Sequence, residues 1–272
     1  MNEPELIAQA RTGDRDAFAA LYAPVERPLA AFLYRLLAER QEAEDLAQDA
    51  VVQALETIGS FEGPSFRVWL FRLAAESALA RLEGEPPWNP DQQIRFGQRA
   101  AEDDALRRRV RKAHDAGIHT TFTIPEHVDY CFLCMGRTFP PRDTALLLLV
   151  AVHGFTYGEA GAVLGLTAST AETRFRMAEQ ALVEIFEPRC SLINARGSCT
   201  LCAGYHTLLY GDRRRTEQAL FQIDLQVRPT PGERAATLEQ RLEIVRSIDP
   251  LHAEGTRFHE ALMTMTLNKR PN

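Results

Sequence analysis

The sequence lacks the long apolar run, about 18 residues, that a membrane-spanning helix requires. Its beginning, MNEPELIAQA, has neither the basic start nor the apolar stretch of a signal peptide. The alternation of apolar and polar residues that is typical of β-strands is almost absent. We therefore expect a cytoplasmic, all-α protein with no membrane span.

The chain also lacks an excess of positive charge, since its formal net charge is −6. Proteins that bind nucleic acid without sequence preference do so mainly by neutralising phosphates with Lys and Arg. The charge argues against that class of protein. Any contact with DNA is expected to be local or to be assisted by a partner.

Cysteine is scarce and odd in number, with five residues in the chain. Three of them fall in CSLINARGSCTLC, from Cys190 to Cys202. Structural disulfides are disfavoured in a reducing cytosol, so metal binding or thiol chemistry is the better functional interpretation.

The chain of 272 residues exceeds the usual ~100 to 200 residues of one domain. Helical periodicity and helix-breaking residues divide it into four segments. Residues 1–83 show about four helices, and residues 84–122 show a breaker-rich linker with one short helix. Helical spacing returns over 123–187, and 188–272 form a helical, cysteine-bearing C-terminal extension. The prediction is two small helical domains joined by a linker, plus the extension.

The stretch FTYGEAGAVLGLTASTAETRFRMAEQAL has the spacing of a helix-turn-helix. Thr156 and Glu159 can form a capping box, Gly165 permits a tight turn, and Thr167 or Ser169 can cap the second helix. An ordinary helical hairpin is the alternative interpretation. A recognition helix so placed would present these residues to the major groove: Ser169, Thr170, Thr173, Arg174 and Arg176.

The first segment favours the DNA-binding interpretation. ELIAQARTGDRDAFAALYAPVERPLAAFLYRLL, followed by EAEDLAQDAVVQALETIGSFEGPSFRVWLFRLAAESALARL, resembles region 2 of the extracytoplasmic-function (ECF) branch of the sigma-70 family. The helix-turn-helix resembles region 4 of the same family. The resemblance implies a bacterial factor that binds RNA polymerase core, opens the −10 element with region 2 and reads the −35 element with region 4.

Two sets of residues in the first domain acquire roles from this resemblance. The resemblance implies that the surface that docks on the coiled coil of the largest polymerase subunits consists of Glu44, Asp45, Gln48 and Asp49. From their spacing alone, these residues could equally form a solvated charged face of a helix. The family captures an unstacked −10 base in the loop 59–65, where the candidates are Ser60, Phe61 and Ser65. Trp69 is expected in the core.

The charges depart from the family pattern. Residues 1–83 contain 8 Arg and 14 Asp or Glu, which gives a net charge of −6. Residues 123–186 contain 4 Arg and 7 Asp or Glu, which gives a net charge of −3. We therefore expect weak DNA binding by the chain alone, with promoter recognition only inside the polymerase holoenzyme. The alternative is a sigma-like mimic that binds an anti-sigma factor or polymerase without reading promoters.

The cysteines form two Cys-x-x-Cys pairs, Cys131 with Cys134 and Cys199 with Cys202. Four thiolates can hold one tetrahedral zinc ion, with Cys190 spare or substituting for one of them. A redox-responsive pair and buried structural cysteines are the alternatives.

The cysteine pattern also resembles a subgroup of these sigma factors with a cysteine-containing C-terminal extension. His252 and His259 could complete a site with Cys190, although surface or capping roles are the simpler account. No constellation of nucleophile and base indicates catalysis, and a thiol redox enzyme using Cys131 and Cys134 would lack the βαβ context of that chemistry. We expect a protein that is not an enzyme.

Overall fold

The computed structural model of the protein describes residues 2–116, 122–192, 196–221 and 234–267. Over these residues the chain forms fifteen α-helices, a 3-10 turn, a π-helical turn and one isolated β-bridge. The all-α prediction is therefore confirmed. None of the described helices combines the length and the apolar content needed to cross a membrane.

The chain divides into two compact units. Unit 1 comprises Met1–Pro86 and Pro140–Ala178, and unit 2 comprises Pro87–Phe139 and Glu179–Asn272. The boundary between Ala178 and Glu179 falls inside one long helix.

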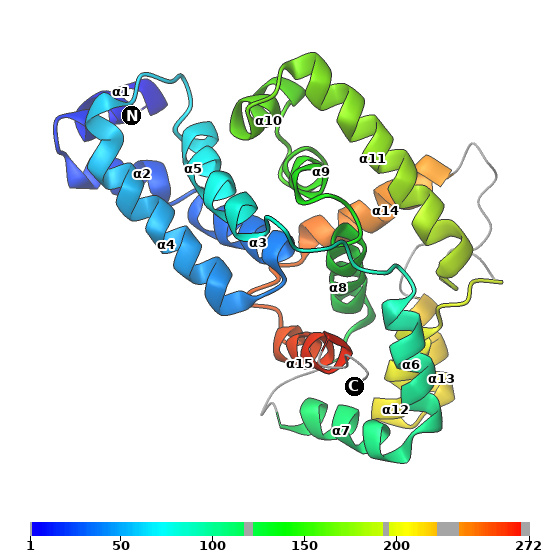
Figure 1. The fold of residues 1–272 in the computed structure, drawn as a ribbon. Coiled ribbons are helices and arrows are strands. Elements are labelled where there is room, and N and C mark those ends of the chain that lie inside the picture. Colours follow the sequence, from blue (N-terminus) through cyan, green and yellow to red (C-terminus); the bar gives the residue numbers. More distant parts are fainter. Residues whose placement is uncertain (1, 117–121, 193–195, 222–233, 268–272) are drawn as a thin grey trace. The chain divides into compact units, whose positions relative to one another are not determined.

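Five helices and a short turn form the first part of unit 1 (Figure 1, blue to cyan). Helix α4 carries alanines at three- and four-residue spacing on its buried face, and this small-residue face lets α3 and α5 pack closely against it. The elements are α1 (Glu3–Arg11), α2 (Arg15–Tyr22), α3 (Glu26–Leu37), α4 (Arg40–Thr57), η1 (Ile58–Ser60) and α5 (Phe66–Arg81).

The helix-turn-helix completes unit 1, with α10 packed on α5. Its local geometry confirms the sequence prediction. Thr156 and Glu159 form the capping box, Gly165 adopts the left-handed conformation with φ 68°, and Thr167 accepts from the Thr170 amide at 3.2 Å. The elements are α9 (Pro141–Leu147), η2 (Leu148–Val152), α10 (Tyr157–Leu164) and α11 (Ala168–Arg189).

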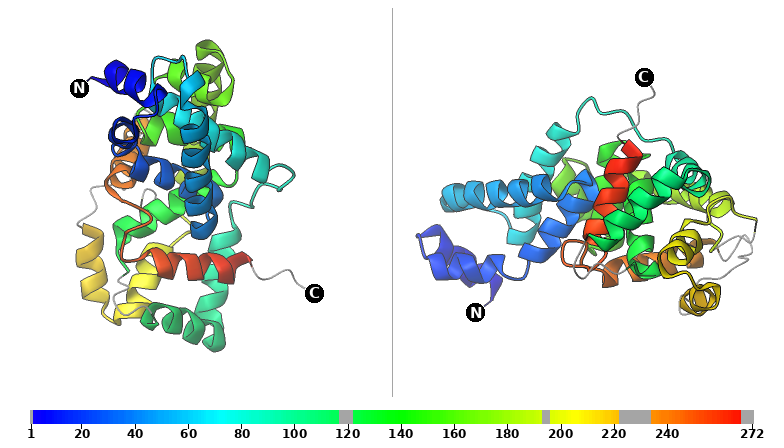
Figure 2. Two further views of the ribbon diagram at one scale, coloured as in Figure 1. Left: turned by 90° about the vertical axis from the view of Figure 1, so that its left-hand side faces the viewer. Right: turned by 90° about the horizontal axis from the view of Figure 1, so that it is seen from below.

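Unit 2 combines three helices from the middle of the chain with four from the C-terminal part. Helices α12 and α13 pack together, as both views in Figure 2 show in yellow and gold. The elements are α6 (Gln92–Glu102), α7 (Asp104–Asp115), α8 (Ile124–Gly136), α12 (Leu201–Tyr210), α13 (Arg213–Phe221), α14 (Arg234–Ser247) and α15 (Thr256–Leu267).

The two units differ from the predicted divisions of the chain. The expected linker 84–122 contributes two amphipathic helices, α6 and α7, whose apolar faces are buried. Helix α8, expected to begin the region 4-like domain, packs instead with α12, α14 and α15. The physical reason is that α8 is buried along most of its length, so its apolar surface is too wide for one neighbouring helix to cover.

Candidate functional site

Helix α4 exposes a surface that mixes acidic, amide and aliphatic side chains. Asp45, Gln48 and Asp49 are exposed and recur at the spacing that places them on one helix face. On the same face, the side chains of Val52 and Leu55 are 53% and 45% exposed. These five residues are called the α4 surface below.

The remaining residue of the predicted stripe lies at the margin of this surface. Glu44 is half-buried and pairs with Arg40 at 3.0 Å. Leu55, although aliphatic, is not on the buried face of α4. Small alanines face α3 and α5, so the larger aliphatic side chain turns toward solvent. Exposed aliphatic groups beside carboxylates are typical of a surface that docks on an apolar and basic partner.

In the loop 59–65, the aromatic candidate for base capture, Phe61, packs inward beneath the loop. Phe61 is buried and stacks on Trp69 with 4.6 Å between ring centroids and 22° between planes. Trp69, expected in the core, is half-buried at the edge of this stack. The Ser60 hydroxyl donates to the Thr57 carbonyl at 2.9 Å, and Ser65 caps α5. The Phe61 ring face is therefore covered, while both serines stay near the surface.

Helix α11 carries the predicted DNA-facing residues. Ser169, Thr170 and Thr173 are exposed in its first two turns. The Thr173 hydroxyl donates to the Ser169 carbonyl at 3.0 Å, and the Thr170 hydroxyl pairs with that of Thr167 at 2.8 Å. Met177 lies one turn beyond Thr173, and its exposed fraction of 68% is the highest of the large apolar side chains in the described helices.

Both predicted DNA-reading arginines are held by carboxylates. Arg174 is half-buried, and two of its guanidinium nitrogens lie 2.8 and 2.7 Å from one oxygen of Asp143, at the start of α9. Arg176 pairs with Glu172, one turn earlier on α11, at 2.9 Å. Each arginine would have to exchange its carboxylate for a phosphate or a base in order to contact DNA.

The cysteines of unit 2 do not assemble as the two predicted pairs. Cys134 is buried, and its sulfur accepts a hydrogen bond from Gln93 Nε2 of α6 at 2.7 Å. The other four thiols affect one another, and the Cys131 thiol also raises the pKa of Cys134. Burial raises the pKa of Cys202 well above its usual range, and the neighbouring thiols of Cys190, Cys131 and Cys199 raise it further.

No metal-ligand set is preformed within the part of the chain that the structure describes: no three His, Cys, Asp or Glu side chains are arranged to hold an ion. The histidines expected near Cys190 bond elsewhere. His252 is exposed and lies 3.0 Å from Asp249, while His259 is buried with its Nε2 3.3 Å from His127 Nδ1. The simpler account, a surface role, holds for His252, whereas the packing of α15 on α8 buries His259 against His127. Neither histidine is arranged with Cys190 to hold an ion.

Sequence reasoning missed the residues that hold these groups. Asp143 lies 31 residues before Arg174, and no local pattern links them. Arg241, which donates from a terminal nitrogen to the Cys190 sulfur at 2.6 Å, did leave a signal. It stands among Leu238, Leu242 and Val245 on the apolar stripe of α14, where a charge needs a buried partner.

Comparison with known proteins gives consistent matches. The Sigma-70 region 2 family model matches residues 21–85, which include the α4 surface and the loop 59–65. The RNA polymerase sigma-H factor of Pseudomonas aeruginosa is 25% identical over 196 residues, covering 68% of this chain and 94% of that protein. The ECF RNA polymerase sigma factor SigW of Bacillus subtilis is 24% identical over 178 residues, covering 65% and 92%.

A solved structure with a similar chain is the sigma factor RpoE of Bartonella quintana, in complex with the anti-sigma factor NepR. It aligns with a TM-score of 0.44 and 21% identity, covering 62% of this chain and 96% of that chain.

Proposed function

Because the chain belongs to the extracytoplasmic-function type of the sigma-70 family, we propose that it binds RNA polymerase core and directs it to promoters for transcription initiation. The observation that carries the proposal is the α4 surface, which lies inside the region 2 match and exposes aliphatic side chains beside carboxylates. The protein acts in the cytoplasm as a non-catalytic initiation factor.

Core binding uses the α4 surface. Val52 and Leu55 supply the apolar contact, and Asp45 and Asp49 meet basic groups of the polymerase at its margin. Apolar contact contributes most of the binding free energy in such an interface, while charge mainly sets the orientation and the rate of association.

The −10 element contacts the loop 59–65. The exposed hydroxyl of Ser60 and the cap residue Ser65 are its polar groups. The stacked pair of Phe61 and Trp69 supports the loop from beneath, so Phe61 acts by stiffening the loop rather than by offering its own ring face.

The −35 element contacts α11. Ser169 and Thr170 face phosphates from exposed positions, and Thr173 can donate to one after leaving the Ser169 carbonyl. Arg174 contacts a phosphate or a base after leaving Asp143. Autonomous binding is weak, because both arginines are paired with carboxylates and the surrounding segments carry net negative charge.

Unit 1 must open for both elements to be read together. Promoter elements 25 base pairs apart lie about 85 Å apart along B-form DNA. A compact unit of about 125 residues has a radius of gyration of only about 14 Å. Since α10 packs on α5 within this unit, binding to core polymerase separates these two helices.

A second candidate function is a sigma mimic that binds an anti-sigma factor or polymerase without reading promoters. The observation that favours it is that both predicted DNA-reading arginines are already paired within the protein. An anti-sigma factor is a natural partner under either function, because the exposed apolar side chains of α4 and α11 give it a surface to cover.

Run-off transcription with purified core polymerase separates the two functions. Genomic fragments selected by the reconstituted complex serve as templates. A sigma factor yields transcripts with one defined start on a fragment, and omission of the protein abolishes them. Stable core binding without any defined transcript would support the mimic and contradict promoter recognition.

A further inference from the structure

Cys190 and Cys199 are brought side by side by the backbone between α11 and α12. They form an isolated parallel β-bridge, in which the Ser191 amide donates to the Cys199 carbonyl at 3.0 Å and the Cys199 amide donates to the Arg189 carbonyl at 2.6 Å. Gly197 lies so close to this bridge that a Cβ there would be 2.5 Å from the Cys190 carbonyl carbon. The two cysteines are thus held at a close backbone contact that admits only glycine at position 197.

Two further thiols come from helices packed around this turn. Cys202 lies in the first turn of α12, and Cys131 lies on α8, which packs against α12. Burial raises the pKa of Cys131 far above its usual range, and the thiols of Cys199 and Cys190 raise it further. The Cys131 thiol also raises the pKa of Cys134, but the Cys134 sulfur is already bonded by Gln93. The other four thiols, Cys131, Cys190, Cys199 and Cys202, are called the thiol cluster below.

A buried arginine faces this cluster. The Arg241 side chain, only 1% exposed, donates from a terminal nitrogen to the Cys190 sulfur at 2.6 Å and lies over the Phe186 ring at 4.3 Å. Its Nε is buried with no hydrogen-bond partner. A guanidinium buried among neutral thiols is costly, whereas one beside an anionic group is stabilised. The position of Arg241 therefore points to negative charge in the cluster.

A redox switch fits these thiols poorly. Reactive cysteines are generally exposed and have lowered pKa values. Here burial raises the pKa of Cys199 to about 11, and it raises those of Cys131 and Cys202 well above their usual range. A bound divalent cation would reverse this effect, because it attracts the thiolate form of every cysteine that it contacts.

We propose that Cys131, Cys190, Cys199 and Cys202 bind one zinc ion as thiolates, and that Arg241 offsets part of the charge of the site. Four thiolates around Zn²⁺ carry a net charge of −2, which one guanidinium halves. Cys134 is excluded from the site by its bond to Gln93. Since the described donors are not arranged around an ion, binding would require their side chains to rotate toward the Zn²⁺, which displaces their protons and offsets the repulsion between the thiolates. The proposal is independent of promoter recognition.

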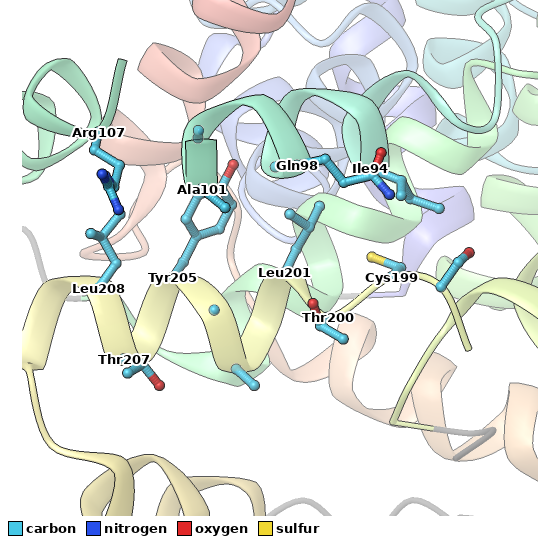
Figure 3. A pocket seen from close by; sticks show the side chains of 15 residues that line it. Ile94, Gln98, Ala101, Arg107, Cys199, Thr200, Leu201, Tyr205, Thr207 and Leu208 are labelled. Atoms are coloured by element: carbon cyan, nitrogen blue, oxygen red, sulfur yellow. The ribbon is translucent and has the colours of Figure 1, made fainter. Parts of the chain in front are cut away.

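The cluster has a route to solvent at Cys199. A cavity of about 580 Å³ lies between α6 and α12, and Cys199 is part of its wall. Figure 3 shows Cys199 at one end of this cavity, next to Thr200 and Leu201, with Ile94 and Gln98 on the α6 side. A metal ion can therefore reach the cluster without unfolding of unit 2, as a metal site requires.

The test compares two single variants that differ only in which buried thiol is removed. The full chain is purified anaerobically without chelator, and zinc per chain is measured by elemental analysis. About one zinc per chain is expected for the wild type and for Cys134→Ser, and loss of most of it for Cys190→Ser. Because Cys190→Ser also removes the acceptor of Arg241, Cys202→Ser is measured as well and is expected to lose zinc to the same degree.

Substitution with Co²⁺ gives a second readout. The sulfur-to-cobalt charge-transfer absorption reflects the number of thiolate ligands, so Cys134→Ser is expected to retain the full band and Cys190→Ser to lose about a quarter or more of it. Circular dichroism establishes that the variants keep their helical content. Loss of zinc from Cys134→Ser with retention in Cys190→Ser would overturn the assignment. A wild type that stays free of zinc after anaerobic dialysis against the ion would overturn the proposal entirely.

Discussion

The pairing of Arg174 with Asp143 predicts that one substitution strengthens DNA binding while weakening the fold. Asp143→Asn keeps the side-chain volume and removes the charge that holds the guanidinium. The ion pair is partly exposed, and Asp143 also lies in the first turn of α9, so its loss is expected to cost about 1 kcal/mol of unfolding free energy. The released arginine then becomes available to a phosphate.

The size of the gain follows from counterion release. One additional phosphate contact steepens the slope of log K against log salt by about 0.9. A four-fold rise in salt then weakens the Asp143→Asn variant about 3.5-fold more than the wild type. Fluorescence anisotropy with a short labelled duplex, measured from low to moderate salt, reports both the affinity and the slope.

The control for this prediction is the double variant Asp143→Asn, Arg174→Ala. It removes the same negative charge but has no arginine to release, so its slope is expected to match that of Arg174→Ala alone. A steeper slope that persists in the double variant would show that the loss of Asp143 acts through the general field. If the salt slope of Asp143→Asn equals that of the wild type, the assignment of Arg174 to the DNA-contacting surface of α11 is refuted.

Three further predictions concern the packing of each unit. Burial lowers the pKa of His153 to about 3, so the folded protein binds fewer protons than the unfolded chain between pH 3 and 6.5 and loses stability as pH falls through this window. The variant His153→Phe replaces a ring whose Nε2 has no partner, and urea unfolding should show that it loses about 1–2 kcal/mol less unfolding free energy than the wild type between pH 7 and 5. An equal loss of stability in both proteins would contradict this assignment. Gly197→Ala cannot keep its contact with Cys190 and should cost about 1–3 kcal/mol of unfolding free energy together with the bound zinc, whereas full zinc content would show that the turn is dispensable. Arg67 lies 3.9 Å from the centre of the Phe155 ring, where α5 meets the segment before α10, so Arg67→Ala should ease the opening of unit 1 and raise run-off transcription up to about five-fold; reduced transcription with intact core binding would argue against opening.

The parts of the fold that were predictable from sequence depend on neighbouring residues. The capping box of Thr156 with Glu159 and the turn at Gly165 involve groups within a few residues of one another, and the structure matches them. Helical periodicity likewise identified α10 and α11.

The remaining features depend on which elements pack together. Cys131 and Cys134 are three residues apart on α8, so their side chains point in directions about 60° apart. This angle is large enough for the two side chains to contact different neighbouring helices. Gln93 binds Cys134 from a segment expected to be a linker, while Cys131 joins the thiol cluster. Spacing within α8 cannot reveal this division, because it is set by α6, α12 and α14.

Core binding by the α4 surface is the claim on which the account most depends. Its most direct test is the affinity for purified RNA polymerase core of Val52→Arg and Leu55→Arg, compared with Met177→Arg, which makes the same change at an exposed apolar side chain of α11. The account predicts at least about a ten-fold loss for the two α4 variants and no loss for Met177→Arg. Wild-type affinity in both α4 variants would contradict it.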